Sequence, residues 1–265
     1  EEPTHPDDVL GHHTIAEAIA PVKVAAGEHV PNRILFKNYL QAGAMAICQV
    51  DAVRVAGVSE FLVISLLAKK FGIAVGAHPS WDDREHFGRR SMQVAPDECY
   101  AIVLYQLGAL QAICKVEEIP LHHVKPHGAL YNQAATDPEL AKAIAAAVKD
   151  FDPNLVLYGM AGSLLVEAGK KIGLRTAAEG FADRTYTNEG LLTPRTMHHA
   201  MITDPKQAVK QVLQLIREQS VSSSEGKLVP LVADTICIHG DGAHAPEFAQ
   251  ALAVALKENN IKVAP

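Results

Sequence analysis

The chain has 265 residues, of which 48% are hydrophobic and 20% are charged, and its formal net charge is -6. This length and composition are typical of a globular protein with one large domain or two small ones. The acidic balance and the lack of a basic tract argue against general nucleic-acid binding. The sequence shows neither a signal-peptide pattern nor a run of about 18 apolar residues. We therefore predict a soluble, cytoplasmic protein that does not act on a membrane.

The cysteines are scattered along the chain without a CxxC pair. They are Cys48, Cys99, Cys114 and Cys237. This distribution predicts reduced, mostly buried thiols rather than a disulfide framework or a zinc knuckle. A catalytic Cys–His pair is the weaker alternative.

The first 45 residues contain few signals for secondary structure. Within them, HPDDVLG (5–11) resembles the zinc-binding opening of the LmbE-like deacetylases. That motif requires a preceding strand, so that its ligands project from a strand end, and only EEPT stands before it. We therefore predict that the polar residues of this opening segment, His5, Asp7, Asp8, His12 and His13, lie on the surface of a mobile terminus.

The rest of the chain alternates apolar, β-rich runs with helical segments. Strands are predicted at residues 42–50, 72–77, 121–124, 155–160, 174–180, 234–240 and 261–265. Helices are predicted at residues 59–71, 96–116, 137–148, 162–172 and 204–218, and after DGAHAPEF to about residue 259, with Ser59 and Thr136 as plausible N-caps. Residues 220–227 are predicted to form a polar surface loop, the place where disorder is most expected.

This alternation predicts a parallel sheet covered by helices. About seven such units favour a closed or nearly closed β/α barrel over an open doubly wound sheet. The sequence contains no GxGxxG or GxxxxGK[ST] motif that would support the open sheet. We therefore predict an α/β fold of the (β/α)-barrel type, with residues 1–265 as a single domain.

Polar residues follow the predicted strands at regular places. They are His78, Lys125 with His127 in KPHGALYN, Glu179 with Asp183 and Arg184, and His239 with Asp241. The carboxyl ends of parallel strands share one face, and active sites form from the loops on that face. We therefore predict that these residues, although far apart in the sequence, converge in one site.

This set of residues suits hydrolysis. A carboxylate or an imidazole can activate water, while a lysine or arginine stabilises an oxyanion or a phosphate. A metal site is a second interpretation because histidine and carboxylate bind zinc, but no HxH or HExxH spacing is present. The sequence leaves the general base open among Glu179, Asp183 and the histidines His78, His127 and His239.

Four long segments resemble the LamB/YcsF family, in the family's order. They are AVGAHPSWDDREHFGRRSM (74–92), HVKPHGALYNQAA (123–135), EGFADRTYTNEGLLTPR (179–195) and ICIHGDGAHAPEFAQAL (236–252). The resemblance implies a (β/α) barrel related to carbohydrate deacetylase and glycoside hydrolase barrels. It also implies ATP-dependent opening of the 5-oxoproline lactam to glutamate, in a complex with the B and C subunits of 5-oxoprolinase. In that scheme the partners phosphorylate the lactam oxygen and this chain hydrolyses the activated ring.

The residues of these segments fit that chemistry. O-phosphorylation makes the ring carbon electrophilic and adds negative charge, which Lys125, Arg89 or Arg184 could hold. We expect catalysis from His78, Lys125, His127, Glu179, Asp183 and His239. We expect substrate binding from Asp83, Arg84, Arg89, Tyr131, Asn132, Arg184, Arg195 and Asp241. Alternatively, Tyr131 and Asn132 only shape their turn, and Arg90 forms a surface ion pair.

The first quarter of the chain departs from the family. The family's DLNADLGE opening and its GFHAGD segment are absent, and VRVAGVSE has Val55 and Val58 where the second motif has His and Asp. The chain is thus either a divergent member with altered activity or one with a foreign N-terminal sequence. Competing functions are a metal-dependent deacetylase-like hydrolase and a non-catalytic ligand-binding or partner subunit. The sequence leaves open the use of a metal and self-association into a homo-oligomer.

Overall fold

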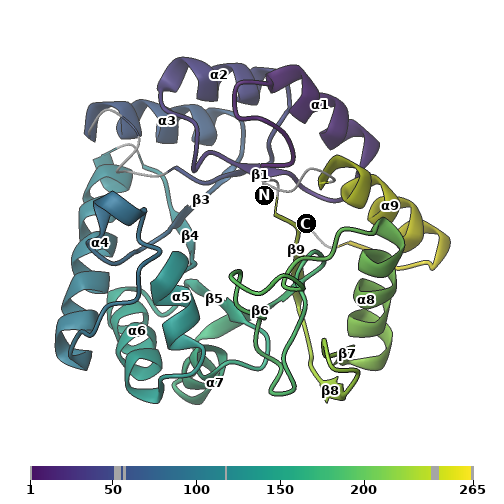
Figure 1. The fold of residues 1–265 in the computed structure, drawn as a ribbon. Coiled ribbons are helices and arrows are strands. Elements are labelled where there is room, and N and C mark those ends of the chain that lie inside the picture. Colours follow the sequence, from purple (N-terminus) through teal and green to yellow (C-terminus); the bar gives the residue numbers. More distant parts are fainter. Residues whose placement is uncertain (1, 51–54, 56–57, 117, 240–244, 264–265) are drawn as a thin grey trace.

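The computed structural model describes residues 2–50, 55, 58–116, 118–239 and 245–263. Its centre is a parallel seven-stranded sheet in the order β1-β2-β3-β4-β5-β6-β9 (Figure 1). The strands are β1 (Ala25–Ala26), β2 (Ile47–Cys48), β3 (Ala74–Ala77), β4 (Leu121–Val124), β5 (Val156–Met160), β6 (Arg175–Phe181) and β9 (Thr235–Cys237). Because spatial order follows chain order, the sheet curls as in a barrel, which confirms the predicted fold class.

Most helices surround this sheet on its outside, and the short helix α5 lies inside their ring (Figure 1). They are α1 (Val9–Ala18), α2 (Arg33–Gln41), α3 (Val58–Lys70), α4 (Pro96–Val116), α5 (Gly128–Ala134), α6 (Pro138–Phe151), α7 (Leu164–Lys171), α8 (Pro205–Glu218) and α9 (Ala245–Glu258), with a short 3-10 helix η1 (Arg84–His86). Helix α1 contacts α9. Ile19 and Val24 form an apolar cluster with Ala249 and Ala253, so the helical layer closes between the first and last parts of the chain.

Side-chain caps fix the starts of several helices. Asp137 accepts hydrogen bonds from the backbone N–H groups of Glu139 and Leu140, and Asp204 accepts one from Lys206. Each aspartate is followed by a proline, which has no N–H to satisfy at the first helical position. The predicted cap Thr136 is therefore wrong by one residue. Ser59 is not a cap either, because α3 already begins at Val58.

Three predicted loops or strands differ from the structure. Residues 220–227 do not form a free loop, because β7 (Ser220–Ser222) pairs with the antiparallel strand β8 (Leu228–Pro230). The Ser223 hydroxyl accepts backbone N–H groups within the turn and donates to Asn188, so side-chain hydrogen bonds order this polar segment. Residues 261–263 form no strand, and the segment after His127 forms the short helix α5 rather than a turn.

Helix α4 combines length with apolar character. It has 21 residues, and its most apolar stretch of 18 residues has a mean hydropathy of 1.4. Among the helices of the described residues, it is the one that is long and apolar enough to cross a membrane. The sequence prediction that no such segment occurs is corrected to this extent. In the fold α4 packs along α6 and buries Cys99, Val103, Leu107 and Cys114, as expected for a helix of the barrel layer.

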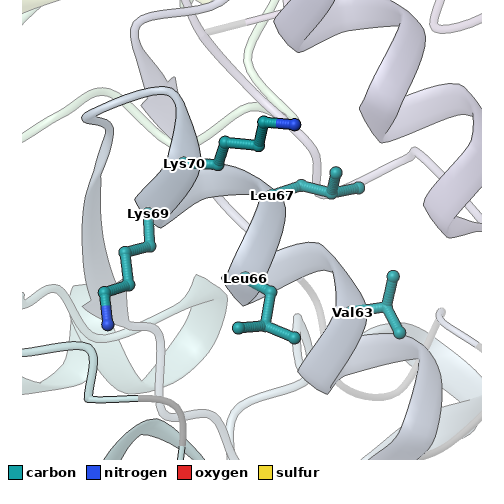
Figure 2. A pocket seen from close by; sticks show the side chains of 5 residues that line it. All are labelled: Val63, Leu66, Leu67, Lys69 and Lys70. Carbon is teal, nitrogen blue, oxygen red and sulfur yellow. The ribbon is translucent and has the colours of Figure 1, made fainter.

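A hollow of about 670 Å³ lies on the outer side of α3. Figure 2 shows its lining side chains along one helix, namely Val63, Leu66, Leu67, Lys69 and Lys70. The two lysines lie at the end of α3, just before the turn into the start of β3. The hollow is therefore near the amino ends of the strands and is separate from the site described below.

His123 fills part of the space beside β3 and β5. Its ring lies 5.3 Å from that of Tyr158, and a Cβ atom on Gly76 would stand 2.1 Å from its Nε2 atom. Glycine at position 76 is therefore required for this packing. Burial, with smaller effects from His122 and Lys125, lowers the pKa of His123 to about 4.

This low pKa predicts a loss of stability in mild acid. Below the ordinary histidine pKa of about 6.5, the unfolded chain binds a proton at His123 that the folded chain does not bind, so stability falls as the pH decreases towards 4. Between about pH 7 and about pH 5 the contribution is about 2 kcal/mol. Urea unfolding at both pH values should show a smaller difference for His123→Gln than for the wild type. The control is His198→Gln at an exposed site, which should lose as much stability between the two pH values as the wild type does. The lowered pKa of His123 would be contradicted if His123→Gln also lost as much as the wild type.

The buried cysteines confirm the prediction of buried thiols. All four are buried and none forms a disulfide. Burial raises the pKa of Cys48 to about 12 and that of Cys114 to about 11, whereas a nucleophilic cysteine needs a lowered pKa. We therefore expect a thiol reagent at neutral pH to react slowly with the native chain and rapidly with the urea-unfolded chain. Rapid modification of one native thiol would revive the Cys–His alternative.

Candidate active site

Two histidines from neighbouring strands meet at the carboxyl-end face of the sheet. His78 follows β3, and His127 follows β4 and precedes α5. Nε2 of His78 lies 2.9 Å from Nδ1 of His127, and the ring planes are inclined by 78°. The other nitrogen of each ring faces a backbone carbonyl oxygen, that of Lys125 at 2.5 Å for His78 and that of Phe87 at 2.8 Å for His127. Both imidazoles are thus held in fixed orientations.

Two glycines allow the loops that carry these contacts to approach each other. Gly88 and Gly128 have positive φ angles of 63° and 54°, a region that favours glycine. The N–H of Ala129 donates to the carbonyl oxygen of Gly88 at 2.9 Å, and a Cβ atom on Gly128 would lie only 2.6 Å from that same oxygen. This close approach brings the Phe87 carbonyl group within reach of His127.

A buried ion pair lies next to the histidines. Nζ of Lys125 is 3.0 Å from Oε1 of Glu179, and the two side chains are only 16% and 7% exposed. The Tyr131 hydroxyl donates to Oε2 of Glu179 at 2.8 Å. Burial and, secondarily, the Glu179 carboxylate raise the pKa of Tyr131, so the phenol keeps its proton and stays a donor. Lys125 is therefore half-buried and His127 is buried, so neither is a solvated loop residue.

A carboxylate–imidazole pair completes the set. Asp183 follows β6, and its Oδ2 atom accepts hydrogen bonds from the backbone N–H and the Nδ1–H of His239, both at 3.0 Å. The His239 ring also stacks on Phe181, with centroids 5.5 Å apart. Because Nδ1 donates to Asp183, a neutral His239 carries its basic lone pair on Nε2. This is the arrangement in which a histidine accepts a proton during catalysis.

These groups form one continuous line of contacts. Phe181 lies between the rings of His239 and Tyr131. The Tyr131 hydroxyl donates to Glu179. Lys125 then connects Glu179, which binds its side chain, with His78, which binds its carbonyl oxygen. The structure thus brings together all the predicted catalytic residues. They come from β3, β4, β6 and β9 or the segments that follow these strands.

The predicted substrate-binding residues are more dispersed. Asp83 is buried and binds Nδ1 of His86 and the backbone N–H of Arg90. Arg90 also lies 3.4 Å from it as an ion pair. Arg184 is buried and donates to the carbonyl oxygens of Thr193 and Ala200. Both residues fasten loops, so substrate binding by Asp83 or Arg184 stays a prediction beside this structural role.

The other predicted ligands are exposed, apart from Tyr131. Arg84, Arg89, Asn132 and Arg195 have exposed side chains. The guanidinium of Arg89 lies 5.2 Å from the centroid of the Phe87 ring, and Asn132 donates to the carbonyl oxygen of Gly128 within its own helix. Asp241 lies outside the described residues. Any contact of these side chains with substrate is therefore still a prediction.

Glu28 is a functional candidate that the sequence alone did not reveal. It follows β1, and a carboxylate oxygen of Glu28 lies within 4.8 Å of ligand nitrogens of His78 and His127. The apolar run VKVAAG (22–27) before it is the same strand-end signal that led to the other residues. The surface role predicted for the N-terminal polar residues is confirmed for His5, Asp7 and Asp8, since Asp8 caps α1 through the N–H of Gly11 while His5 and Asp7 are exposed. It is wrong for His12, which is fully buried in α1 with its ring 4.8 Å from that of Tyr39.

A β/α barrel with paired histidines, a carboxylate–imidazole pair and a buried lysine at its strand ends has the architecture of a barrel hydrolase. Residues 55–265 match the model of the LamB/YcsF family, and the chain belongs to that family. A relative from Geobacillus kaustophilus, named as the A subunit of 5-oxoprolinase, is 45% identical over 96% of this chain and 90% of its own length. The relative of the same name from Brevibacillus brevis is 52% identical over 75% and 78%, respectively.

A solved structure has the same fold. The "Lactam Utilization Protein" of Thermus thermophilus aligns with a TM-score of 0.73 and 40% identity, covering 91% of this chain and 98% of its own. In addition, residues 1–87 match a second family model, described as enolase C-terminal domain-like. The missing DLNADLGE and GFHAGD motifs thus coincide with a segment similar to another family, which favours a foreign N-terminal sequence over gradual divergence.

Proposed function

We propose that this chain hydrolyses the lactam of 5-oxoproline to glutamate, as a cyclic-amide hydrolase that works as the A subunit of an ATP-dependent 5-oxoprolinase. Two observations support this together. The relatives that cover most of the chain carry the name of that subunit, and the Asp183–His239 pair and the Lys125–Glu179 ion pair both lie on the carboxyl-end face of the matched region. The second observation gives the reaction a base and a cation on one face of the barrel.

The residues divide the chemistry between them. His239, oriented by Asp183, accepts a proton from the attacking water, whose oxygen bonds to the activated ring carbon. Lys125 is held by Glu179 and stabilises the negative charge on the phosphorylated lactam oxygen. The proton taken by His239 passes to the ring nitrogen as the C–N bond breaks, which leaves the acyl phosphate of glutamate. A second water then hydrolyses this acyl phosphate to glutamate and inorganic phosphate. Tyr131 keeps Glu179 in position, because its hydroxyl occupies the carboxylate oxygen that Lys125 does not bind.

The partners and compartment are part of the same proposal. ATP is consumed by the complex, with the B and C subunits phosphorylating the lactam, and the assembly works in the cytoplasm. Residues 1–265 act as one domain, because β1 and β2 of the N-terminal segment pair with β3 of the matched region in a single sheet. The substrate-binding residues expected from the sequence surround the lactam in this proposal.

The test supplies the purified chain with B and C subunits, ATP and 5-oxo-L-proline, and measures glutamate and ADP. The Geobacillus kaustophilus relative serves as the positive control with the same partners. Glutamate is expected only from the complete mixture. If the relative forms glutamate and this chain does not, the chain is a non-catalytic partner and the proposal fails. Release of acetate from acetylated amino sugars without ATP would instead identify a deacetylase.

A further inference from the structure

We propose that Glu28, His78 and His127 bind one divalent transition-metal ion of the zinc type. Glu28 follows β1, His78 follows β3 and His127 follows β4. One ligand atom from each residue lies within 4.8 Å of the others. Two imidazole nitrogens and one carboxylate oxygen are a common ligand set for zinc in catalytic sites, where a fourth position holds water or substrate.

The hydrogen bonds of the two rings define which nitrogens face each other. A carbonyl oxygen can only accept, so Nδ1 of His78 and Nε2 of His127 carry the hydrogens that point at Lys125 and Phe87. In neutral rings, the nitrogens that approach to 2.9 Å are then both lone pairs. Two facing lone pairs repel each other. A cation bound by both nitrogens converts this repulsion into attraction.

The same hydrogen bonds have the form expected around a metal. A metal-binding histidine usually donates its other N–H to a carbonyl or carboxylate, which fixes the tautomer and the ring orientation. Two nitrogens at about 2.0–2.1 Å from a tetrahedral zinc ion are separated by about 3.3 Å. The 2.9 Å separation is close to this value. Binding would therefore require a small separation of the two rings and an adjustment of the Glu28 carboxylate, whose oxygen lies within 4.8 Å of both nitrogens.

Glu2 and His29 position Glu28 on its loop. Oε1 of Glu2 accepts the backbone N–H groups of Gly27 and His29, both at 3.0 Å, and Oε2 binds Nδ1 of His29 at 2.5 Å. His29 also lies 3.5 Å from the Glu28 carboxylate. Glu2, Glu28 and His29 form a second group of possible ligands. We assign Glu2 to positioning, because both of its oxygens already hold the turn.

This site combines parts of the chain that match different families. Glu28 lies outside the LamB/YcsF match at residues 55–265, and His127 lies outside the enolase-like match at residues 1–87. The site therefore draws its ligands from both matched segments, and it goes beyond the proposed lactam hydrolysis. Its test needs neither substrate nor partner subunits, so a failure of either proposal leaves the other intact.

The test measures binding of zinc to the metal-depleted full-length chain by calorimetry, with the metal content of the dialysed complex as a second readout. One zinc ion per chain is expected. Glu28→Gln should weaken binding by at least 10-fold, and His127→Asn should abolish stoichiometric binding. Glu85→Gln, on the exposed surface of the loop after β3, is the matched control and should bind as the wild type does. Circular dichroism verifies that each variant is folded.

Cobalt provides a measurement that does not depend on variants. The wild-type chain with one equivalent of Co²⁺ should show the intense visible absorption of a four-coordinate ion with nitrogen ligands. The weak spectrum of the hydrated ion, or the absence of stoichiometric zinc, would overturn the proposal and leave a shared proton between the two rings. Wild-type affinity in Glu28→Gln would also overturn it. So would zinc binding that is lost in Glu2→Gln but retained in His127→Asn.

Discussion

Replacing His239 with glutamine is expected to lower the turnover of 5-oxoproline by roughly 10²–10⁴-fold, the usual contribution of a general base. Nδ1 of His239 donates to Asp183 and the ring stacks on Phe181, so the ring presents Nε2 in one orientation. Glutamine can occupy the space and donate to Asp183, but it cannot accept the proton of the attacking water. The measurement is glutamate formation by the complete complex under saturating 5-oxoproline and ATP.

Asp183→Asn separates positioning from proton transfer. The asparagine oxygen can still accept the backbone N–H of His239, but the charge that favours the Nδ1–H tautomer is lost. We expect a lower kcat with little change in KM, and a pH–rate profile that differs from that of the wild type. His198→Gln, at an exposed position, serves as the control and should leave the rate unchanged. If His239→Gln retains the wild-type rate, another residue is the base.

Replacing Lys125 with methionine is expected to lower the free energy of unfolding by about 3–5 kcal/mol, because removal of one partner leaves a buried charge without compensation. The Glu179 side chain is 7% exposed, and the Tyr131 hydroxyl, which binds its other oxygen, carries no charge to replace that of the lysine. Urea unfolding of the purified chain measures the change. From the sequence alone we would expect Lys125 to be replaceable without an effect on folding, because it follows a strand on a loop, so this measurement decides between the two expectations.

The double variant Lys125→Met with Glu179→Gln tests the physical reason. It removes both charges and keeps an acceptor for the Tyr131 hydroxyl, so most of the lost stability should return. The matched control is Lys142→Met, whose ion pair with Glu139 is 2.6 Å long but 64% and 61% exposed. That variant should lose less than about 1 kcal/mol. Equal losses in Lys125→Met and Lys142→Met would show that burial of the Lys125 pair has no energetic importance.

Local signals in the sequence were sufficient for most of the barrel. Helix α4 begins and ends where its periodicity and its first-turn Pro96 and acidic residues predicted. The short apolar runs likewise predicted β3 to β6, because the strands of a covered parallel sheet are apolar throughout. The hairpin of β7 and β8 escaped prediction because its order comes from side-chain hydrogen bonds of Ser223 with distant Asn188. No local pattern encodes such a contact.

The site shows the same division. The parallel topology alone predicts that residues at the strand ends converge. The positions of five residues after predicted strands therefore marked them as candidates, namely His78, Lys125, His127, Asp183 and His239. The partners of each residue could not be predicted, because the Tyr131–Glu179 and Asp183–His239 contacts depend on side-chain packing between segments about 50 residues apart. Glu28 was missed because β1 has only two residues, too few for a clear strand pattern.

The narrow pairing at the start of the sheet has a consequence for how such a protein can arise. Each of the first two strand pairings involves just two residue positions. In β1 and β2, Ala25 pairs with Ile47 and Ala26 with Cys48. In β2 and β3, Ile47 pairs with Ala74 and Cys48 with Val75. A strand–helix unit from an unrelated barrel satisfies these junctions if it supplies two extended apolar residues in register. Few backbone positions thus have to match where a strand–helix unit joins this sheet, and such a strand still brings a side chain to the carboxyl-end face, as β1 does with Glu28.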